Sequence, residues 1–337
     1  MKEYTNYPIL RYNTFGMDVK TSCFVEYSSV SELQSFLSAK EYSLPLLHIG
    51  GGSNLLFLSD FKGTILHSAI KGIDITEESD EWIDIKVGAG EVWDDFVSYT
   101  VSKGFYGAEN LSIIPGEVGA SAVQNIGAYG VEAKDIILTV HTVRISDSSE
   151  RVFSNEECRY SYRNSIFKGE MKGQYIVTHV TFRLRKSPVL HLSYGNISSE
   201  LEKRNLSPSL ANIRDIIIEV RRSKLPEPEE FGNAGSFFMN PMVSMQKFKQ
   251  LESEFPDIPH YPVDENTVKI PAGWMIDRCG WKGRNIGPAG VYHKQALVLV
   301  NLGGATGKDI SCLADEIIKS VYEKFGVDIH PEVNYIY

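Results

Sequence analysis

The segment from Ser112 to Gly130, SIIPGEVGASAVQNIGAYG, restricts this chain more than any other. It holds four glycines, mostly small side chains, and a single charged residue, Glu117. Glycine has no Cβ, so a ligand can lie directly on such a backbone. Backbone N–H groups exposed in this way can bind a phosphate without a basic side chain. The segment therefore predicts a ligand that carries phosphate.

A second glycine-rich stretch, Gly50–Asn54, follows the apolar run Leu44–Ile49. It could be a phosphate-binding turn or a plain tight turn that needs positive φ, and a triple glycine alone favours the plain turn. The chain has neither G-x-G-x-x-G after a strand nor G-x-x-x-x-G-K-[ST], so a Rossmann site and a P-loop are both unsupported. Two bare segments together make a shared ligand the better interpretation.

Composition narrows the class of protein. The length of 337 residues suggests two or three domains, and the net charge of −9 argues against a nucleic-acid binder. Four scattered cysteines without a C-x-x-C pair fit a reducing cytoplasm and predict neither a disulfide framework nor a zinc site. The polar N-terminus has no signal-peptide core, and no apolar run reaches the length of a membrane span. We expect no membrane, metal or nucleic-acid partner.

Hydrophobic periodicity predicts a mixed chain. In the expected helix over residues 91–103, Val92, Phe96 and Val97 would point inward. Further helices are expected over 30–40 (capped by Ser29), 210–222, 245–255 and 309–325, and strands over 44–49, 64–67, 83–87, 136–145, 174–184 and 296–302. The pattern is α+β, without the steady alternation of a doubly wound sheet. The Pro- and Glu-rich stretch Leu225–Glu230 marks a domain boundary.

Four further motifs each leave an alternative open. Tyr162–Ser165 could be a surface arginine beside a turn, and Gly232–Pro241 a turn followed by a core strand. Ile270–Asp277 could be a helix start with Pro271 in its first turn, and His330–Val333 a solvated carboxylate. Taken separately, none of these motifs decides a function.

In order along the chain, these motifs resemble the MurB family, the bacterial UDP-N-acetylenolpyruvoylglucosamine reductases. The resemblance covers nearly the whole chain and begins at Asn13-Thr14-Phe15-Gly16. Tyr194, within Leu192–Gly195, resembles the tyrosine loop of the type I branch. The fold that this implies is the FAD-binding PCMH/vanillyl-alcohol-oxidase-like one. Its two subdomains would span 1–70 and 71–222, followed by a MurB-type substrate domain over 223–330 and a tail that returns near the site.

The resemblance also implies a reaction. A bacterial cytoplasmic enzyme, expected to be a monomer, would use NADPH to reduce the enolpyruvyl ether of UDP-N-acetylglucosamine to UDP-N-acetylmuramate, for peptidoglycan synthesis. The scheme would be ping-pong, with NADPH leaving before the sugar nucleotide binds. FAD would be held non-covalently by Gly50, Gly51, Gly52, Ser53, Asn54, Ile114, Pro115, Gly116, Gly119, Ala120, Gln124, Asn125, Gly127, Ala128, Tyr129, Gly130 and Arg221.

By the same match, Arg163 and Glu332 would stabilise the charge that develops during hydride addition, and Ser236 would protonate the resulting carbanion. This role requires Glu332 to be protonated or to act through a donor. Substrate contacts would come from Tyr194, Lys224, Asn240, Tyr261 and Gln295. Met239 departs from the lysine that some relatives carry there, which removes a positive charge.

Two other functions stay open. An oxidase on the same FAD-binding fold would often attach flavin covalently through His or Cys. The 112–130 segment contains neither, although His48 lies close to the first glycine turn. A non-catalytic sugar-nucleotide-binding protein is the third alternative, and it would be colourless.

Overall fold

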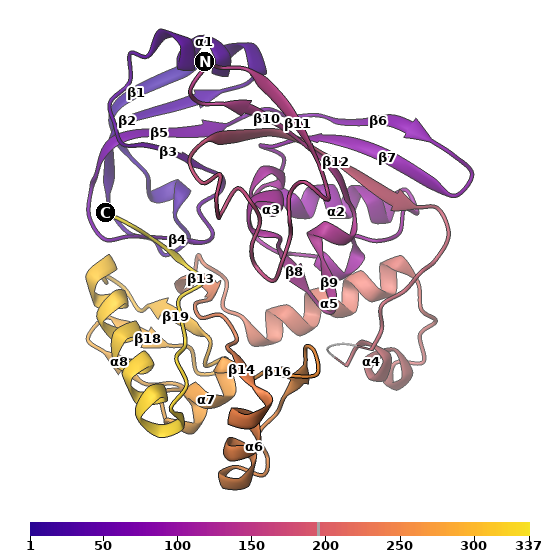
Figure 1. Cartoon of the computed structure of the whole chain (residues 1–337), viewed down its shortest axis with the longest axis vertical. Coiled ribbons are helices and arrows are strands. Elements are labelled where there is room, and N and C mark those ends of the chain that lie inside the picture. The colour runs from indigo at the N-terminus through magenta and orange to yellow at the C-terminus, as the bar shows by residue number, and fades with distance from the viewer. Residues whose placement is uncertain (194–195) are drawn as a thin grey trace. The chain divides into compact units, whose positions relative to one another are not determined.

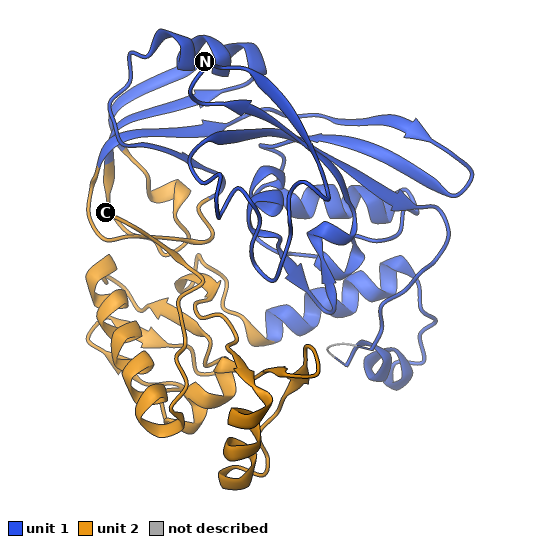
Figure 2. Ribbon diagram, viewed as in Figure 1, with its two compact units in different colours: residues 1–7, 21–51, 62–223 blue, residues 8–20, 52–61, 224–337 orange. Residues whose placement is uncertain are grey.

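The computed structural model describes residues 1–193 and 196–337, and it divides into two compact units (Figure 2). Unit 1 comprises Met1–Tyr7, Thr21–Gly51 and Lys62–Ser223, and unit 2 comprises Pro8–Lys20, Gly52–Phe61 and Lys224–Tyr337. The chain thus passes between the units several times near its N-terminus. The three-part division expected from the sequence stays a prediction.

Unit 1 begins with a four-stranded sheet in the order β1 (Lys2–Pro8), β2 (Lys20–Tyr27), β5 (Phe61–Ser68) and β3 (Leu46–Ile49). Helix α1 (Val30–Ala39) begins as predicted at Ser29, whose hydroxyl accepts a hydrogen bond from the Glu32 amide at 3.1 Å. Its predicted inner side chains Leu33, Phe36 and Leu37 are buried and pack against Val25 and Leu66 of the sheet.

The second sheet of unit 1 is antiparallel, in the order β11 (Glu150–Ser154), β10 (Ile137–Arg144), β12 (Tyr175–Arg185), β7 (Trp82–Gly88) and β6 (Ile73–Glu78). Helices α2 (Trp93–Ser102) and α3 (Val118–Gln124) cover one of its faces (Figure 1). The strands expected over 83–87, 136–145 and 174–184 are confirmed as β7, β10 and β12.

The prediction that Val92 points inward from α2 is wrong. Val92 is 43% exposed and precedes the helix as its cap, whereas Trp93 is buried. The helix begins at Trp93, so its inner face runs through positions 93, 96, 97 and 100. The Trp93 indole also donates to the Leu111 carbonyl at 2.9 Å, which secures this face.

The remaining elements of unit 1 connect these layers. They are η2 (Glu109–Leu111), β8 (Gly127–Ala128), β9 (Val131–Glu132), η3 (Ala133–Asp135), α4 (Ile197–Lys203) and α5 (Leu210–Lys224). The expected stripe of α5 is buried at Leu210, Ile213 and Ile217, and Val220 is half-buried. Ile213 and Ile217 pack in one cluster with Ile197 of α4.

Unit 2 has a sheet in the order β13 (Gly232–Ser236), β19 (Val298–Asn301), β18 (Ala289–Val291) and β17 (Asn285–Ile286). Helices α7 (Ala272–Arg278) and α8 (Gly307–Phe325) share its core, with the predicted α8 stripe buried at Ile310, Leu313, Ile317 and Val321. A smaller sheet of β14 (Met242–Ser244), β16 (Thr267–Lys269) and β15 (Tyr261–Pro262) adjoins α6 (Met245–Glu254).

Strand β20 (Asn334–Ile336) pairs in parallel with β4 (Leu55–Phe57), so the C-terminal segment of unit 2 contacts one of its N-terminal segments. The short helix η1 (Leu10–Tyr12) completes the unit. None of the helices in the described ranges is long and apolar enough to span a membrane.

Candidate functional site

Within unit 1, the first two residues of the Gly50–Asn54 stretch contact the Ser112–Gly130 segment. Strand β3 ends at Ile49, and a Cβ built on Gly51 would lie 3.6 Å from the Gly116 Cα atom. A Cβ built on Gly50 would lie 3.5 Å from the Ala120 Cβ atom. Side chains at positions 50 and 51 would therefore occupy the space between the segments. This bare surface, formed by Gly50–Gly51 and 116–120, is called the cradle below.

Two arginines of unit 1 contact the cofactor segment predicted from the sequence. Arg163, at φ +56°, donates from Nη2 to the Gly127 carbonyl at 2.9 Å. Arg221 extends from α5, with Nη2 at 3.5 Å from the Ile113 carbonyl. Burial lowers the pKa of Arg221, and the nearby charge of Arg163 lowers it further, although Tyr129 acts in the opposite direction. Both guanidinium groups thus contact the backbone of the Ser112–Gly130 segment.

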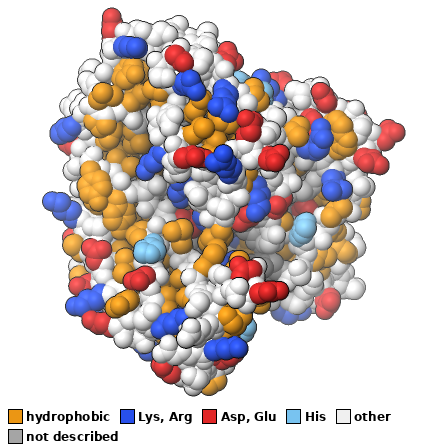
Figure 3. Space-filling view, viewed as in Figure 1, with side chains coloured by type: hydrophobic (Ala, Val, Ile, Leu, Met, Phe, Trp, Pro, Cys, Tyr) orange, Lys and Arg blue, Asp and Glu red, His pale blue; other side chains and the backbone are white. Residues whose placement is uncertain are grey.

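The surroundings of Arg221 fit an anionic group. Its Nε atom is buried and has no hydrogen-bond partner among the described residues. A buried N–H without an acceptor is costly, so an anion placed here would satisfy it and offset the two positive charges. On the face drawn in Figure 3, acidic and basic side chains are interspersed. An anion is therefore attracted by this local pair rather than by a broad basic field.

The start of the segment is fixed by an ion pair that the sequence did not signal. Asp94 of α2 accepts the Ile113 N–H at 2.6 Å and a bidentate pair of bonds from Arg214 at 2.7 and 2.8 Å. Burial raises the pKa of Asp94, but the bonds from Arg214 and the Ile113 amide outweigh it and hold the pKa below its usual value. Ile113 adopts φ +48°, which is strained for a β-branched residue, and Asp94 holds it there.

Asn125 ends α3 in the left-handed region at φ +47°. Its side chain donates to the Ser161 carbonyl at 2.9 Å and accepts the Lys134 amide at 3.0 Å. It also donates to Glu132 at 3.0 Å. The side chain therefore fixes the turn between α3 and the Gly127–Gly130 stretch.

In unit 2, Ser236 is exposed at the end of β13. The next residue, Phe237, donates its N–H to the Leu297 carbonyl at 2.7 Å and accepts the Glu332 N–H at 2.8 Å. The Asn54 side chain donates to the Glu332 carbonyl at 3.3 Å. The structure therefore brings two expected catalytic residues, Ser236 and Glu332, onto neighbouring backbone segments of unit 2, whereas Arg163 belongs to unit 1.

The turn before Ser236 is fixed by Asn233, which is 4% exposed. Its amide donates to the Phe231 carbonyl at 2.8 Å and the Pro226 carbonyl at 3.3 Å, and its Oδ1 accepts the Gly235 N–H at 2.9 Å. The Asn233 backbone bonds in turn to Thr14, with the Asn233 N–H donating to the Thr14 carbonyl at 2.9 Å. The Asn13–Gly16 motif thus supports β13.

The expected substrate residues of unit 2 are spread over several elements. The Asn240 Oδ1 accepts the Ala272 N–H at 2.9 Å at the start of α7, and the Gln295 Oε1 accepts the Leu297 N–H at 3.3 Å. Tyr261 is 42% exposed, with Lys269 Nζ at 5.8 Å from its ring centre. Lys224 is exposed at the end of α5. Tyr194 lies outside the described residues.

Comparisons with known proteins agree with this arrangement. The model of the UDP-N-acetylenolpyruvoylglucosamine reductase C-terminal domain matches residues 227–336, and the model of an FAD binding domain matches residues 21–153. A UDP-N-acetylenolpyruvoylglucosamine reductase of Bacteroides fragilis (strain YCH46) is 56% identical over 330 residues, which are 98% of this chain and 99% of the relative. The chain belongs to the UDP-N-acetylenolpyruvoylglucosamine reductase family.

Solved structures bear on the fold of this MurB-family chain. The crystal structure of MurB from Thermus caldophilus is similar with a TM-score of 0.68 at 22% identity, covering 100% of this chain and 98% of that one. A 6-hydroxy-D-nicotine oxidase from Arthrobacter nicotinovorans is similar with a TM-score of 0.53 at 13% identity, covering 97% and 86%. The expected α+β, FAD-binding fold with a MurB-type C-terminal domain is confirmed, and the chain is an FAD-dependent oxidoreductase.

Proposed function

We propose that this reductase uses NADPH to reduce the enolpyruvyl group of UDP-N-acetylglucosamine enolpyruvate, giving UDP-N-acetylmuramate. The observation that carries the proposal is the placement of Ser236, exposed at the end of β13 and adjacent to Phe237, whose carbonyl holds the Glu332 amide. Reduction of an activated double bond requires a proton donor and polar groups that stabilise the developing charge. The family membership supports the same reaction.

The residues of unit 1 fit FAD. The cradle offers the bare backbone of Gly50, Gly51 and Gly116, and Arg163 and Arg221 supply positive charge at Gly127 and Ile113 of the same glycine-rich segment. FAD held by these residues would supply hydride transfer between the two substrates. His48 Nε2 already contacts the Tyr27 hydroxyl at 2.8 Å, and the 112–130 segment contains neither His nor Cys. We therefore propose non-covalent binding.

Arg163 is proposed to stabilise the negative charge that spreads into the substrate carboxylate. Its guanidinium is permanently charged, and its planar fork matches carboxylate geometry. The bond from Nη2 to the Gly127 carbonyl fixes the direction of this fork. Glu332 is proposed to assist, either protonated or through a donor, and the bond between its own N–H and the Phe237 carbonyl fixes its backbone.

Ser236 is proposed to protonate the carbanion. A hydroxyl is a weak acid, so it can serve only against a strongly basic carbon and only if its proton is replaced. Ser236 is exposed, and water can resupply the proton. Tyr194, Lys224, Asn240, Tyr261 and Gln295 remain proposed contacts to the sugar nucleotide.

An anaerobic two-step titration tests this function. NADPH should bleach the yellow protein, and UDP-N-acetylglucosamine enolpyruvate should then restore the colour. If the colour does not return, the proposed reaction is wrong. Acid precipitation tests the oxidase alternative, because flavin that stays with the pellet would indicate a covalent bond and contradict the proposal. A colourless protein that gains no flavin on reconstitution would favour the sugar-nucleotide-binding alternative.

A further inference from the structure

Glu117 is a negative charge at a site for an anion. It is the only charged residue between Ser112 and Gly130, and it directly precedes α3. Its Oε2 atom lies 3.3 Å from the position of a Cβ on Gly50, so the carboxylate stands at the edge of the cradle. A free carboxylate here would repel the diphosphate of FAD, because like charges at short range destabilise each other, most strongly where water is partly excluded.

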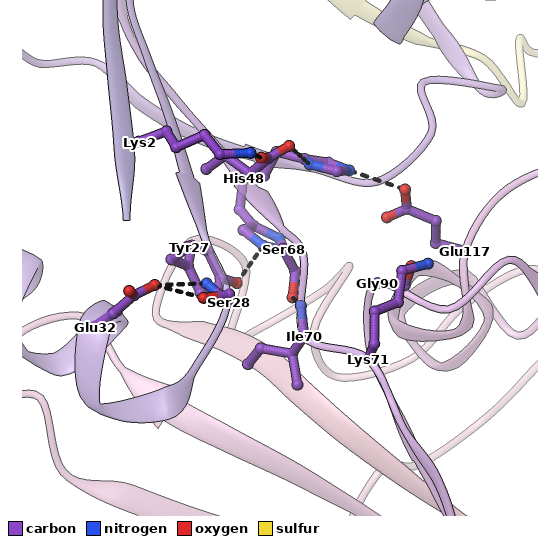
Figure 4. A network of polar contacts seen from close by, with 12 residues as sticks. Lys2, Tyr27, Ser28, Glu32, His48, Ser68, Ile70, Lys71, Gly90 and Glu117 are labelled. Atoms are coloured by element: carbon purple, nitrogen blue, oxygen red, sulfur yellow. Dashed lines mark hydrogen bonds and ion pairs between the residues drawn. The ribbon is translucent and has the colours of Figure 1, made fainter.

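His67 of β5 contacts this carboxylate. Its Nε2 lies 2.9 Å from the Glu117 Oε1, and its Nδ1 lies 3.6 Å from a carboxylate oxygen of Glu26. Figure 4 labels the two ends of this network, Glu117 and Lys2. Glu26 also accepts a hydrogen bond from Lys2 at 3.0 Å. The His67 and Glu117 side chains are only 10% and 13% exposed. The Nε2 contact with Glu117 is of hydrogen-bond length, and the Nδ1 lies within ion-pair distance of Glu26.

The position of His67 in the sheet explains why its side chain contacts Glu117. In the parallel pairing of β3 with β5, His67 is the register partner of Ile49, the residue directly before Gly50. Glu117 therefore has His67 at one oxygen and the glycine turn at the other. The His67 side chain thereby connects the four-stranded sheet to Glu117 of the cradle.

We propose that His67 is a positioning residue for FAD: it binds one oxygen of the Glu117 carboxylate and fixes this carboxylate at the edge of the cradle, so that it does not turn toward the bound diphosphate. This inference rests on the proposed role of the cradle in FAD binding. If the proposal holds, the Glu117 carboxylate weakens FAD binding only when His67 is absent. A purely structural network would behave differently, because removal of either partner would then weaken FAD binding and removal of both would not restore it.

The test compares three variants as apoproteins: His67→Gln, Glu117→Gln and the double variant. FAD affinity is measured from the change in flavin fluorescence on titration, and the stability of each apoprotein from its thermal unfolding. His67→Gln should weaken FAD binding about tenfold or more, as expected when a hydrogen bond to a charged group is lost. Glu117→Gln alone should bind FAD at least as tightly as the wild type, and the double variant should recover most of the lost affinity.

His141→Gln is the matched control, since it removes a half-buried histidine of unit 1 that bonds to Thr181 at 3.1 Å. It should leave FAD affinity unchanged. The proposal is overturned if His67→Gln binds FAD like the wild type, or if the double variant binds as weakly as His67→Gln. These readouts concern binding alone, so a wild type that binds FAD but fails to reduce the sugar nucleotide refutes only the proposed function. A wild-type apoprotein that binds no FAD refutes both.

Discussion

Replacing Asn233 with alanine should lower the free energy of unfolding and also slow the reaction step that depends on Ser236. The side chain makes three hydrogen bonds, two donated at 2.8 and 3.3 Å and one accepted at 2.9 Å, in the turn that precedes Ser236. At about 0.5–1.5 kcal/mol each, their loss should lower the free energy of unfolding by about 2–4 kcal/mol. The freed turn should also displace the Ser236 hydroxyl. A displacement of about 1 Å typically costs about 100-fold in rate.

Two assays measure these effects. Urea unfolding gives the loss of stability, and anaerobic stopped-flow gives the rates of flavin reduction by NADPH and of reoxidation by the sugar nucleotide. We expect reduction near the wild-type rate and reoxidation slowed about 100-fold. Asn155→Ala is the control, because Asn155 likewise donates to two carbonyls, of Lys134 and Ile137, at 2.8 and 2.7 Å in unit 1. If Asn233→Ala loses stability but reoxidises at the wild-type rate, the turn does not position Ser236.

Three further predictions concern packing, cofactor binding and pH. Gly232→Ala should lower the free energy of unfolding by about 3 kcal/mol in a urea titration, because the new Cβ would lie 2.2 Å from the Phe15 carbonyl oxygen. A variant as stable as the wild type would contradict this packing. Arg221→Met should weaken FAD binding about 10–100-fold in a fluorescence titration without destabilising the apoprotein, and unchanged affinity would remove Arg221 from the cofactor site. The pKa of Asp94 is held below its unfolded value, so its contribution to stability is present above that value and is lost as pH falls through the folded pKa. Asp94→Asn should therefore be less stable at pH 7 but lose less stability than the wild type below about pH 4, and parallel pH profiles would contradict the role of the bond to Arg214.

The sequence predicted those elements whose residues show a cap, a helical stripe or an apolar run within a short segment. The Ser29 cap, the α8 stripe and the strand before Gly50 are each visible in a few residues. The cap and the stripe are confirmed, and the strand is confirmed from Leu46 onward, since Leu44 precedes it and is 74% exposed. The N-terminal strand β1 and the strand β6 were not predicted. Both are mostly exposed strands at sheet edges. The β1 sequence lacks the alternation that marks a half-buried strand, and in β6 the alternation lasts only from Ile73 to Thr76 before two glutamates follow.

The site shows a similar division. The two glycine segments and Arg163 lie in short, recognisable motifs, and the structure brings Gly50 and Gly51 against residues 116–120 and Arg163 against Gly127. The pairing of His67 with Glu117 joins residues 50 positions apart, and that of Asp94 with Arg214 joins residues 120 positions apart. No local pattern signals such pairs. The only available hint was that a stretch otherwise free of charge contains Glu117.

The most direct test of the account is the pair of half-reactions in Ser236→Ala. Flavin reduction by NADPH should stay near the wild-type rate, because the hydroxyl takes no part in that step. Reoxidation by UDP-N-acetylglucosamine enolpyruvate should slow about 100-fold or more, which is typical of a lost general acid. If both half-reactions slow equally, or if reoxidation keeps its wild-type rate, Ser236 is not the proton donor and the proposed mechanism is wrong.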